Sequence, residues 1–387
     1  MSPEAARRLG LWRLVGSEMS MFTAKVRPAF SRKGLHWVEQ LATDPLWQEA
    51  EERTGNRMIP VVFTPEGECI QDSSVILDLL EERHPEIPIE SPDPVVKLLG
   101  RLFEIYHDEF MPMLAIYYRW IEPRAIEEGK ARAIAMTGLP DMGERGLATV
   151  GGYAPLFGIE AATIPAIEAH YRDLLDALEA HLATTPYVLG DVPSLADFSL
   201  CGAGHAHLYL DEVPHRIMWQ RAPRVTHWMM RVVNADPFAS GEWLDPTSPP
   251  PGFVDLLRTV GRAAGEYLAD VARALAEPMA GVAVGRGMPR ALGVHRTRVC
   301  GVATNRVTTP YTLFMIQRVQ DVHRSLAPDD RRRAEALLDG TGWEALLEVP
   351  TPARVALVKH KLVRVESSPG ATGATAFREA WTAIRAG

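Results

Sequence analysis

The sequence is poor in cysteine, and its cysteines are scattered. Only Cys69, Cys201 and Cys300 occur in 387 residues. No two of them form a Cys-x-x-Cys pair, so neither a disulfide framework nor a zinc site is indicated. Long apolar runs are missing as well, since no stretch approaches the roughly 20 residues that span a bilayer. The first ten residues, MSPEAARRLG, lack the hydrophobic core of a signal peptide. We therefore expect a cytoplasmic protein that does not bind membranes.

A surplus of positive charge is also absent. The sequence has 41 Lys and Arg against 49 Asp and Glu, a net charge of −8. This balance gives no reason to expect nucleic acid or an anionic membrane as a partner. Hydrophobic residues make up 47% of the chain and charged residues 23%, which is ordinary for a globular protein. The chain is too long for one ordinary core, so we expect two or three domains.

The stretch from Met58 to Ile76 is the most informative part of the sequence. Its first apolar run, Val61–Phe63, follows an Ile-Pro step, and a Pro-Glu-Gly turn leads into a second short run, Cys69–Gln71. This order predicts a β-hairpin. Asp72 or Ser73 can then cap a helix whose apolar residues recur at helical spacing. The helix N-terminus where this carboxylate and hydroxyl lie is also an anion site, because unpaired N–H groups and the helix dipole favour an incoming carboxylate.

These residues resemble the glutathione-binding half of the thioredoxin-like domain in glutathione transferases. The resemblance implies that Pro60 is a cis-proline and that the backbone of Ile59 pairs with the cysteinyl part of glutathione. It also implies that Asp72 and Ser73 hold the γ-glutamyl end. A plain hairpin followed by a capped helix is the alternative.

The residues before the hairpin fit the same domain. Leu11–Val15 predicts a buried strand and Met21–Phe30 a helix, which Pro28 should kink or confine to its first turns. Leu35–Val38 fits a second strand and Leu46–Glu52 a short helix. The order strand, helix, strand, helix, strand, strand, helix matches the thioredoxin-like order.

A second signature lies in the following helical part. After a proline-rich linker, Val95–Trp120 predicts a long amphipathic helix with a possible bend at Pro112. The glycine-rich sequence over 138–158 predicts irregular structure, and another helix is predicted over Thr163–Leu182. Ser194 with Asp197 then forms a capping-box pattern, which closely resembles the start of the core helix in the helical domain of glutathione transferases.

The two signatures together imply a thioredoxin-like α/β domain followed by an all-α domain. We expect a tail over 1–10, the glutathione-binding domain over 11–90, the helical domain over 95–245 and a mainly helical extension over 250–387. The resemblance stops before the extension. There, helices are predicted over 253–275, 309–326 and 331–347, and β-favouring residues broken by glycines lie between 282 and 307.

Glutathione transferases lower the pKa of the glutathione thiol, because the thiolate is the nucleophile. The resemblance to the omega-like and tau-like pattern places Ser20 on the catalytic position and Phe22 on the aromatic position at the glutathione site. Met21 replaces the proline that is usual between them. Ser17 is the rival hydrogen-bond donor, and a simple helix cap is the alternative role for Ser20. A serine cannot form mixed disulfides, so conjugation, isomerisation or elimination fits better than thiol transfer.

The resemblance also places Tyr106, Phe110 and Tyr117 beside the electrophilic substrate. Any amphipathic helix shows such an aromatic stripe, however, and core packing is the alternative role for these residues. His205, His207, Asp211 and His215 could suggest a metal. Residues two apart on a helix face different ways, however, so we expect no metal site.

The function that the sequence predicts is a homodimeric, detoxifying glutathione transferase, with glutathione as co-substrate and a small apolar electrophile as partner. Two alternatives stay open. One is a binding or scaffold protein that keeps the fold without the chemistry, and the other is a specialised glutathione-dependent isomerase or lyase.

Overall fold

A computed structural model describes residues 3–42 and 44–366. These residues form two compact units. Unit 1 comprises the residues up to Ser91, Ala115–Gly152 and Leu182–Leu244, and unit 2 comprises Pro92–Leu114, Tyr153–His181 and the residues from Asp245 onward. The helical domain predicted over 95–245 contributes residues to both units, and its boundaries stay a prediction.

Unit 1 contains a four-stranded mixed sheet with the order β2-β1-β3-β4. Its strands are β1 (Trp12–Gly16), β2 (Trp37–Leu41), β3 (Val61–Phe63) and β4 (Cys69–Gln71). β1 is parallel to β2 and antiparallel to β3, and β3 is antiparallel to β4. The predicted hairpin is therefore confirmed as β3 and β4, and the element order of the N-terminal part is confirmed as well.

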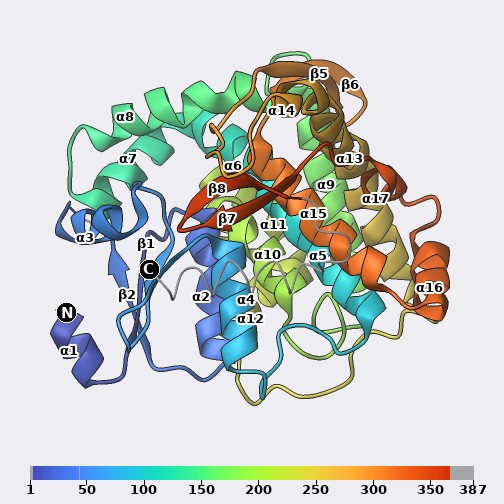
Figure 1. The fold of residues 1–387 in the computed structure, drawn as a ribbon, viewed down its shortest axis with the longest axis horizontal. Helices are drawn as coiled ribbons and strands as arrows, with labels where there is room; N and C mark the ends of the chain where they lie inside the picture. The colour runs from blue at the N-terminus through green and yellow to red at the C-terminus, as the bar shows by residue number, and fades with distance from the viewer. Residues whose placement is uncertain (1–2, 43, 367–387) are drawn as a thin grey trace. The chain divides into compact units, whose positions relative to one another are not determined.

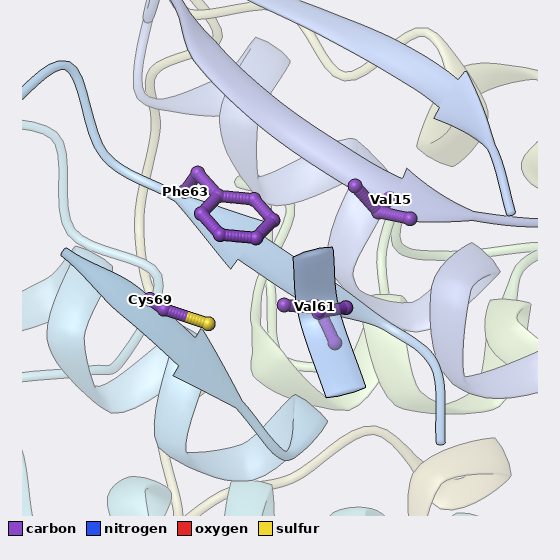
Figure 2. Close-up of a cluster of buried hydrophobic side chains, with 5 residues drawn as sticks. Val15, Val61, Phe63 and Cys69 are labelled. Carbon is purple, nitrogen blue, oxygen red and sulfur yellow. The ribbon is translucent and has the colours of Figure 1, made fainter. Parts of the chain in front are cut away.

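Helices cover this sheet. They are α2 (Met21–Arg32), α3 (Asp44–Thr54) and α4 (Ser73–Arg83), with α1 (Pro3–Arg8) before the first strand. Figure 2 shows Val15, Val61, Phe63 and Cys69 gathered in one buried cluster, which Ala50 of α3 completes. α2 and α4 pack against each other beside the sheet (Figure 1). Burial raises the pKa of the Cys69 thiol to about 11, so this cysteine is a packed core residue and a poor nucleophile.

Helix α2 runs through Pro28 and ends at Arg32. The expectation that Pro28 confines the helix to its first turns is therefore wrong. Proline removes one backbone hydrogen bond of a helix. Here the apolar residues on both sides of the proline, Val26, Ala29 and Phe30, are fully buried, and this packing keeps the helix continuous beyond the lost bond.

The long helix predicted over Val95–Trp120 is divided. It consists of α5 (Pro94–Glu109), α6 (Met111–Ile116) and a π-helix, η1 (Tyr117–Ile121). The break lies at Phe110, two residues before Pro112, in agreement with the predicted bend. In η1 the amide of Glu122 donates to the carbonyl of Tyr117 at 2.9 Å, five residues back.

The glycine-rich stretch is more regular than its composition suggests. The remaining helices of this part are α7 (Ile126–Thr137), α8 (Met142–Thr149) and the 3-10 helix η2 (Gly151–Phe157). Gly138 ends α7 with a φ of +70°, a conformation that favours glycine. The prediction of irregular structure over 138–158 is therefore wrong for most of that range.

The predicted capping box is confirmed at α10 (Leu195–Ala203). The buried Asp197 carboxylate accepts hydrogen bonds from the Ser194 amide at 3.0 Å and hydroxyl at 2.6 Å. The Val188 amide at 2.9 Å and Nε1 of Trp228 at 2.8 Å donate to it as well. This carboxylate thus ties the helix start to two other segments of unit 1. The segments that follow are η3 (Gly204–Tyr209), α11 (Glu212–Arg221) and α12 (Pro223–Val233).

Unit 2 combines the extension with α5 and with α9 (Ile164–His181). Its further helices are α13 (Pro251–Ala274), α14 (Ala276–Ala280), α15 (Pro310–Ser325), α16 (Pro328–Leu338) and α17 (Glu344–Glu348). Two hairpins accompany them: β5 (Val294–Val299) with β6 (Val302–Val307), and β7 (Arg354–Val358) with β8 (Lys361–Val365). The first two predicted helices of the extension are confirmed, and the third is divided into α16 and α17.

The extension packs tightly on α5 and α9 within unit 2. α15 lies beside α5, and α13 beside α9 (Figure 1). A buried ion pair joins Arg306 of β6 to Glu109 of α5 at 3.0 Å. The extension is thus part of a folded core and not an appended tail. None of the helices within residues 3–42 and 44–366 combines the length and apolar character that a membrane crossing requires.

Candidate active site

The turn before α2 presents two serine hydroxyls. Ser20 caps α2, and its Oγ accepts a hydrogen bond from the amide of Thr23 at 3.2 Å. The amide of Ser20 donates to the carbonyl of Ser17 at 3.0 Å. Oγ of Ser17 accepts from the amide of Met19 at 3.3 Å. Both hydroxyls act as acceptors, and neither O–H donates to another described residue, so both Ser20 and Ser17 keep a donor for a ligand.

Gly16 is required for this turn. The amide of Ser17 donates to Oγ1 of Thr23 at 3.4 Å, which brings the Thr23 side chain close to the strand end. A Cβ at position 16 would lie 2.4 Å from Cγ2 of Thr23, a separation that side chains do not tolerate. The absence of a side chain at Gly16 therefore lets the first turn of α2 approach β1.

The peptide bond between Ile59 and Pro60 is cis, which confirms the prediction for Pro60. Asn56 and Gln71 hold the preceding segment, because their amide groups exchange hydrogen bonds at 2.8 Å. Nε2 of Gln71 also donates to the carbonyl of Met58 at 2.7 Å. Neither the amide nor the carbonyl of Ile59 is bonded to a described residue. This partly exposed residue therefore keeps one donor and one acceptor for an extended ligand backbone.

Asp72 caps α4, as predicted. Its Oδ1 accepts from the amides of Ser74 at 3.0 Å and Val75 at 3.2 Å. The φ angle of Asp72 is +85°, which is uncommon for any residue except glycine and is tolerated best by Asp and Asn. Such backbone strain concentrates at binding and catalytic sites. Ser73 follows as a buried residue in the first turn of the helix, 4% exposed.

A buried lysine links the two helix N-termini. Nζ of Lys25 in α2 donates to Oγ of Ser74 in α4 at 3.1 Å, and both residues are fully buried. No local sequence pattern pointed to this contact between Lys25 and Ser74. The contact keeps an ammonium group close to the helix start that Asp72 caps.

The predicted residues of unit 1 share a pattern of exposure. Ser17, Ser20, Phe22, Ile59 and Asp72 are partly exposed, whereas Pro60 and Ser73 are buried. Two capped helix N-termini and a backbone segment with unused hydrogen-bonding groups can hold an extended anionic ligand, because the helix dipoles favour negative charge.

The three predicted substrate residues fall in different units. Tyr106 and Phe110 belong to unit 2, are fully buried and stack with ring centroids 5.3 Å apart. The Tyr106 hydroxyl lies 2.7 Å from Nε2 of His170. Burial raises the pKa of Tyr106 and lowers that of His170 to about 4. Tyr117 belongs to unit 1 and is 3% exposed. Their role in binding a substrate stays a prediction.

The histidines that could suggest a metal have other contacts. Nδ1 of His215 lies 2.6 Å from the carbonyl of Tyr209, and Asp211 forms a buried ion pair with Arg119 at 2.9 Å. Burial raises the pKa of Asp211, and the Arg119 guanidinium opposes that rise. Within the described part of the chain, no three His, Cys, Asp or Glu side chains are placed to hold a metal ion.

Sequence reasoning missed Arg119 altogether.

Two family models match parts of the chain. Residues 14–88 match the family described as glutathione S-transferase, N-terminal domain, and residues 161–231 match glutathione S-transferase, C-terminal domain. A comparison with curated protein sequences found no significant match. The sequence resemblance and the expected fold class, an α/β domain followed by a helical part with further helices and strands beyond residue 250, are thereby confirmed.

Solved structures resemble the chain more weakly. A glutathione S-transferase from Methylobacterium radiotolerans, in complex with glutathione sulfonate, is 20% identical, with 60% of this chain and 97% of that chain covered and a TM-score of 0.37. One from Rhodospirillum rubrum is 20% identical, with 63% and 99% covered and a TM-score of 0.39. One from Methylobacillus flagellatus, with glutathione bound, is 18% identical, with 58% and 99% covered and a TM-score of 0.37.

Proposed function

We propose that this chain is a member of the glutathione S-transferase superfamily, because its residues 14–88 and 161–231 match the N- and C-terminal domains of that family. In this proposal it binds glutathione at the N-termini of α2 and α4 and activates the thiol. The observation that carries the proposal is the unused hydrogen-bonding capacity of two groups in unit 1, the Ser20 hydroxyl and the Ile59 backbone beside cis-Pro60. The N-terminus of α4, which Asp72 caps, belongs to the same unit.

Glutathione is an extended tripeptide with carboxylates at both ends and one ammonium group. The cysteinyl backbone pairs with the amide and carbonyl of Ile59. The γ-glutamyl carboxylate is held by the amide and hydroxyl of Ser73, and its ammonium by the Asp72 carboxylate. Each hydrogen bond that involves a charged partner contributes about 1.5–3 kcal/mol. Phe22 packs beside the ligand at the start of α2.

Thiol activation requires a hydrogen-bond donor that binds the thiolate more strongly than it binds the protonated thiol. A free thiol has a pKa near roughly 8.5, and each unit by which the site lowers this value corresponds to about 1.4 kcal/mol of preference for the anion. The Ser20 hydroxyl stands at the N-terminus of α2, where the helix dipole adds to its effect. Ser17 keeps an equivalent donor and stays the rival for this role.

The activated thiolate attacks a small apolar electrophile in this proposal, and Tyr117 of unit 1 is the candidate residue near that substrate. A serine in place of a cysteine favours conjugation over thiol transfer, because it cannot form a disulfide with glutathione. We further propose a homodimer and a cytoplasmic location, as the superfamily resemblance suggests.

This function is tested by a pH titration of the protein with glutathione. The thiolate absorbance near 240 nm is followed while the pH is raised. A titration midpoint below that of free glutathione, together with conjugation of a chlorodinitrobenzene, supports a transferase. Binding with an unshifted midpoint would instead indicate a glutathione-binding protein without thiol activation. The absence of any bound thiolate signal and of any binding would contradict the proposal.

A further inference from the structure

Arg119 is the most heavily hydrogen-bonded side chain next to the turn that ends at Ser20. It lies in η1 and is 1% exposed. Its Nε donates to Oδ2 of Asp211 at 2.9 Å, and its Nη2 to Oδ1 at 3.0 Å. Nη1 donates to the carbonyl of Met19 at 3.1 Å, and Nη2 also donates to the carbonyl of Ala206. Nε2 of His207 also lies 3.4 Å from Nη1. One guanidinium thus contacts one carboxylate, two backbone carbonyls and one imidazole ring.

These contacts join segments that are far apart in the chain but belong to unit 1. Met19, Ala206 and Asp211 are 100, 87 and 92 residues from Arg119. Met19 directly precedes Ser20, Ala206 lies in η3, and Asp211 precedes α11. The guanidinium is therefore a shared anchor for the serine turn and for the π-helical segment η3.

The π-helical geometry of η3 supplies one of the anchor points. In an α-helix the carbonyl of Ala206 would accept from the amide of Leu210, four residues later. Here the amide of Leu210 donates instead to the carbonyl of His205, at 3.1 Å. The amide of Asp211 donates to the carbonyl of His207, at 3.0 Å. The Ala206 carbonyl is thereby released from the helix ladder and is used by Arg119. Such π-helical turns occur frequently at functional sites.

Only arginine can make this set of contacts. The guanidinium has five N–H donors in a rigid plane, whereas the lysine ammonium has three donors on a flexible stem. The contact to Met19 is to a backbone carbonyl, so it restrains the path of the turn and not one side chain. Because Ser20 follows directly, the position of its hydroxyl depends on where that carbonyl is held.

We propose that Arg119 is a positioning residue, which fixes the Met19 carbonyl so that the turn presents the Ser20 hydroxyl to the glutathione thiol. This inference rests on the proposed function, and it assigns Arg119 no contact with glutathione. The guanidinium charge is balanced by Asp211 at 2.9 Å, so the effect is geometric and is not a direct attraction of the thiolate.

Two substitutions separate geometry from charge. Arg119→Lys keeps the charge but cannot maintain the planar set of contacts. Asp211→Asn removes the balancing carboxylate and leaves the arginine cationic, although less firmly oriented. Positioning predicts that both variants raise the pKa of the bound thiol, by about one unit for Arg119→Lys, which means about ten-fold less thiolate near neutral pH. A purely electrostatic role predicts instead that Asp211→Asn lowers that pKa.

Arg132 provides a matched control. Its Nε lies 3.4 Å from Oδ1 of the same Asp211 carboxylate, and its Nη2 donates to the carbonyl of Leu210. It makes no contact with Met19 or Ser20. Arg132→Gln therefore removes a cation from the same carboxylate without touching the turn, and it is expected to leave both the exchange of the α2 amides and the pKa of the bound thiol unchanged.

Hydrogen exchange of the amides of residues 20–24, measured on the full chain without ligand, tests the positioning itself. Arg119→Lys should accelerate this exchange by about five-fold or more, because the local structure opens more readily, while Arg132→Gln leaves it unchanged. Exchange in Arg119→Lys equal to wild type would overturn the inference. Should that variant not fold, Asp211→Asn provides the same comparison.

The thiol titration then connects positioning to chemistry. A raised thiol pKa in Arg119→Lys and Asp211→Asn, with wild-type values in Arg132→Gln, supports the inference. A thiol pKa that is unchanged in Arg119→Lys, or lowered in Asp211→Asn, would overturn it. If the wild-type protein binds no glutathione, the proposed function fails, and the exchange comparison still decides whether Arg119 positions the turn.

Discussion

Asp72 offers the sharpest mutational test, because it has two separable tasks in the proposed site. Its Oδ1 caps α4 through the amides of Ser74 and Val75 at 3.0 and 3.2 Å, and its carboxylate holds the glutathione ammonium in the proposal. Asn caps a helix about as well as Asp and also tolerates the φ of +85°. Asp72→Asn therefore preserves the cap and removes the charge, whereas Asp72→Ala removes both.

The expected magnitudes follow from these two tasks. Loss of a hydrogen bond to a charged group costs about 1.5–3 kcal/mol, so both variants should bind glutathione roughly 10- to 150-fold more weakly. Loss of the cap costs about 1 kcal/mol of folding stability, and this loss should appear in Asp72→Ala alone. Calorimetric titration measures the binding, and chemical unfolding measures the stability.

Asp93 provides the matched control for the cap. Its Oδ1 accepts from the amides of Val95 at 2.8 Å and Val96 at 3.2 Å at the start of α5, so it repeats in unit 2 the two cap hydrogen bonds of Asp72, at an ordinary φ of −71°. Asp93→Asn should leave glutathione binding unchanged. Wild-type affinity in Asp72→Asn, with weakened binding only in Asp72→Ala, would show that Asp72 acts through the cap alone and would refute the proposed clamp.

Three further predictions follow from the structure. Ser20→Ala should spare glutathione binding and raise the pKa of the bound thiol by about one to two units; an unaltered thiolate titration would transfer the donor role to Ser17, which Ser17→Ala tests directly. Burial lowers the pKa of His170 to about 4, below the unfolded value of about 6.5, so its contribution to stability is complete above pH 6.5 and is lost as the pH falls toward 4. The loss amounts to about 3 kcal/mol, and His170→Gln should abolish this part of the pH dependence in acid unfolding; an identical dependence would contradict the assignment. Asp197→Ala leaves the buried donors of Ser194, Val188 and Trp228 without their acceptor, so it should destabilise the protein by at least about 3 kcal/mol in urea unfolding; a loss below about 1 kcal/mol would show that the capping box is dispensable.

The sequence predicted those features that depend on neighbouring residues. The hairpin from Val61 to Gln71 and the caps at Ser20 and Asp72 arise from turns and hydrogen bonds that span only a few residues. The capping box at Asp197 is equally local. These signals are the same wherever the segment lies in the fold, which is why they could be identified without a structure.

The features that the sequence did not predict depend on distant neighbours. The bond from Lys25 to Ser74 spans 49 residues, and the bond from Arg119 to Met19 spans 100, so no local pattern could indicate either. Helix α2 continues through Pro28 because of packing that only the tertiary structure supplies. The stripe with Tyr106 and Phe110 indicated burial correctly, but periodicity does not tell which neighbour buries a helix face. Here that neighbour includes His170 of α9.

Calorimetric titration of glutathione into the purified full-length protein, with S-hexylglutathione alongside, tests the central claim most directly. The account predicts that both ligands bind at one site per chain and that the alkylated form binds more tightly, because its chain buries apolar surface beside the thiol position. The absence of binding of either ligand at millimolar concentration would contradict the claim that this chain uses the glutathione S-transferase fold to bind glutathione.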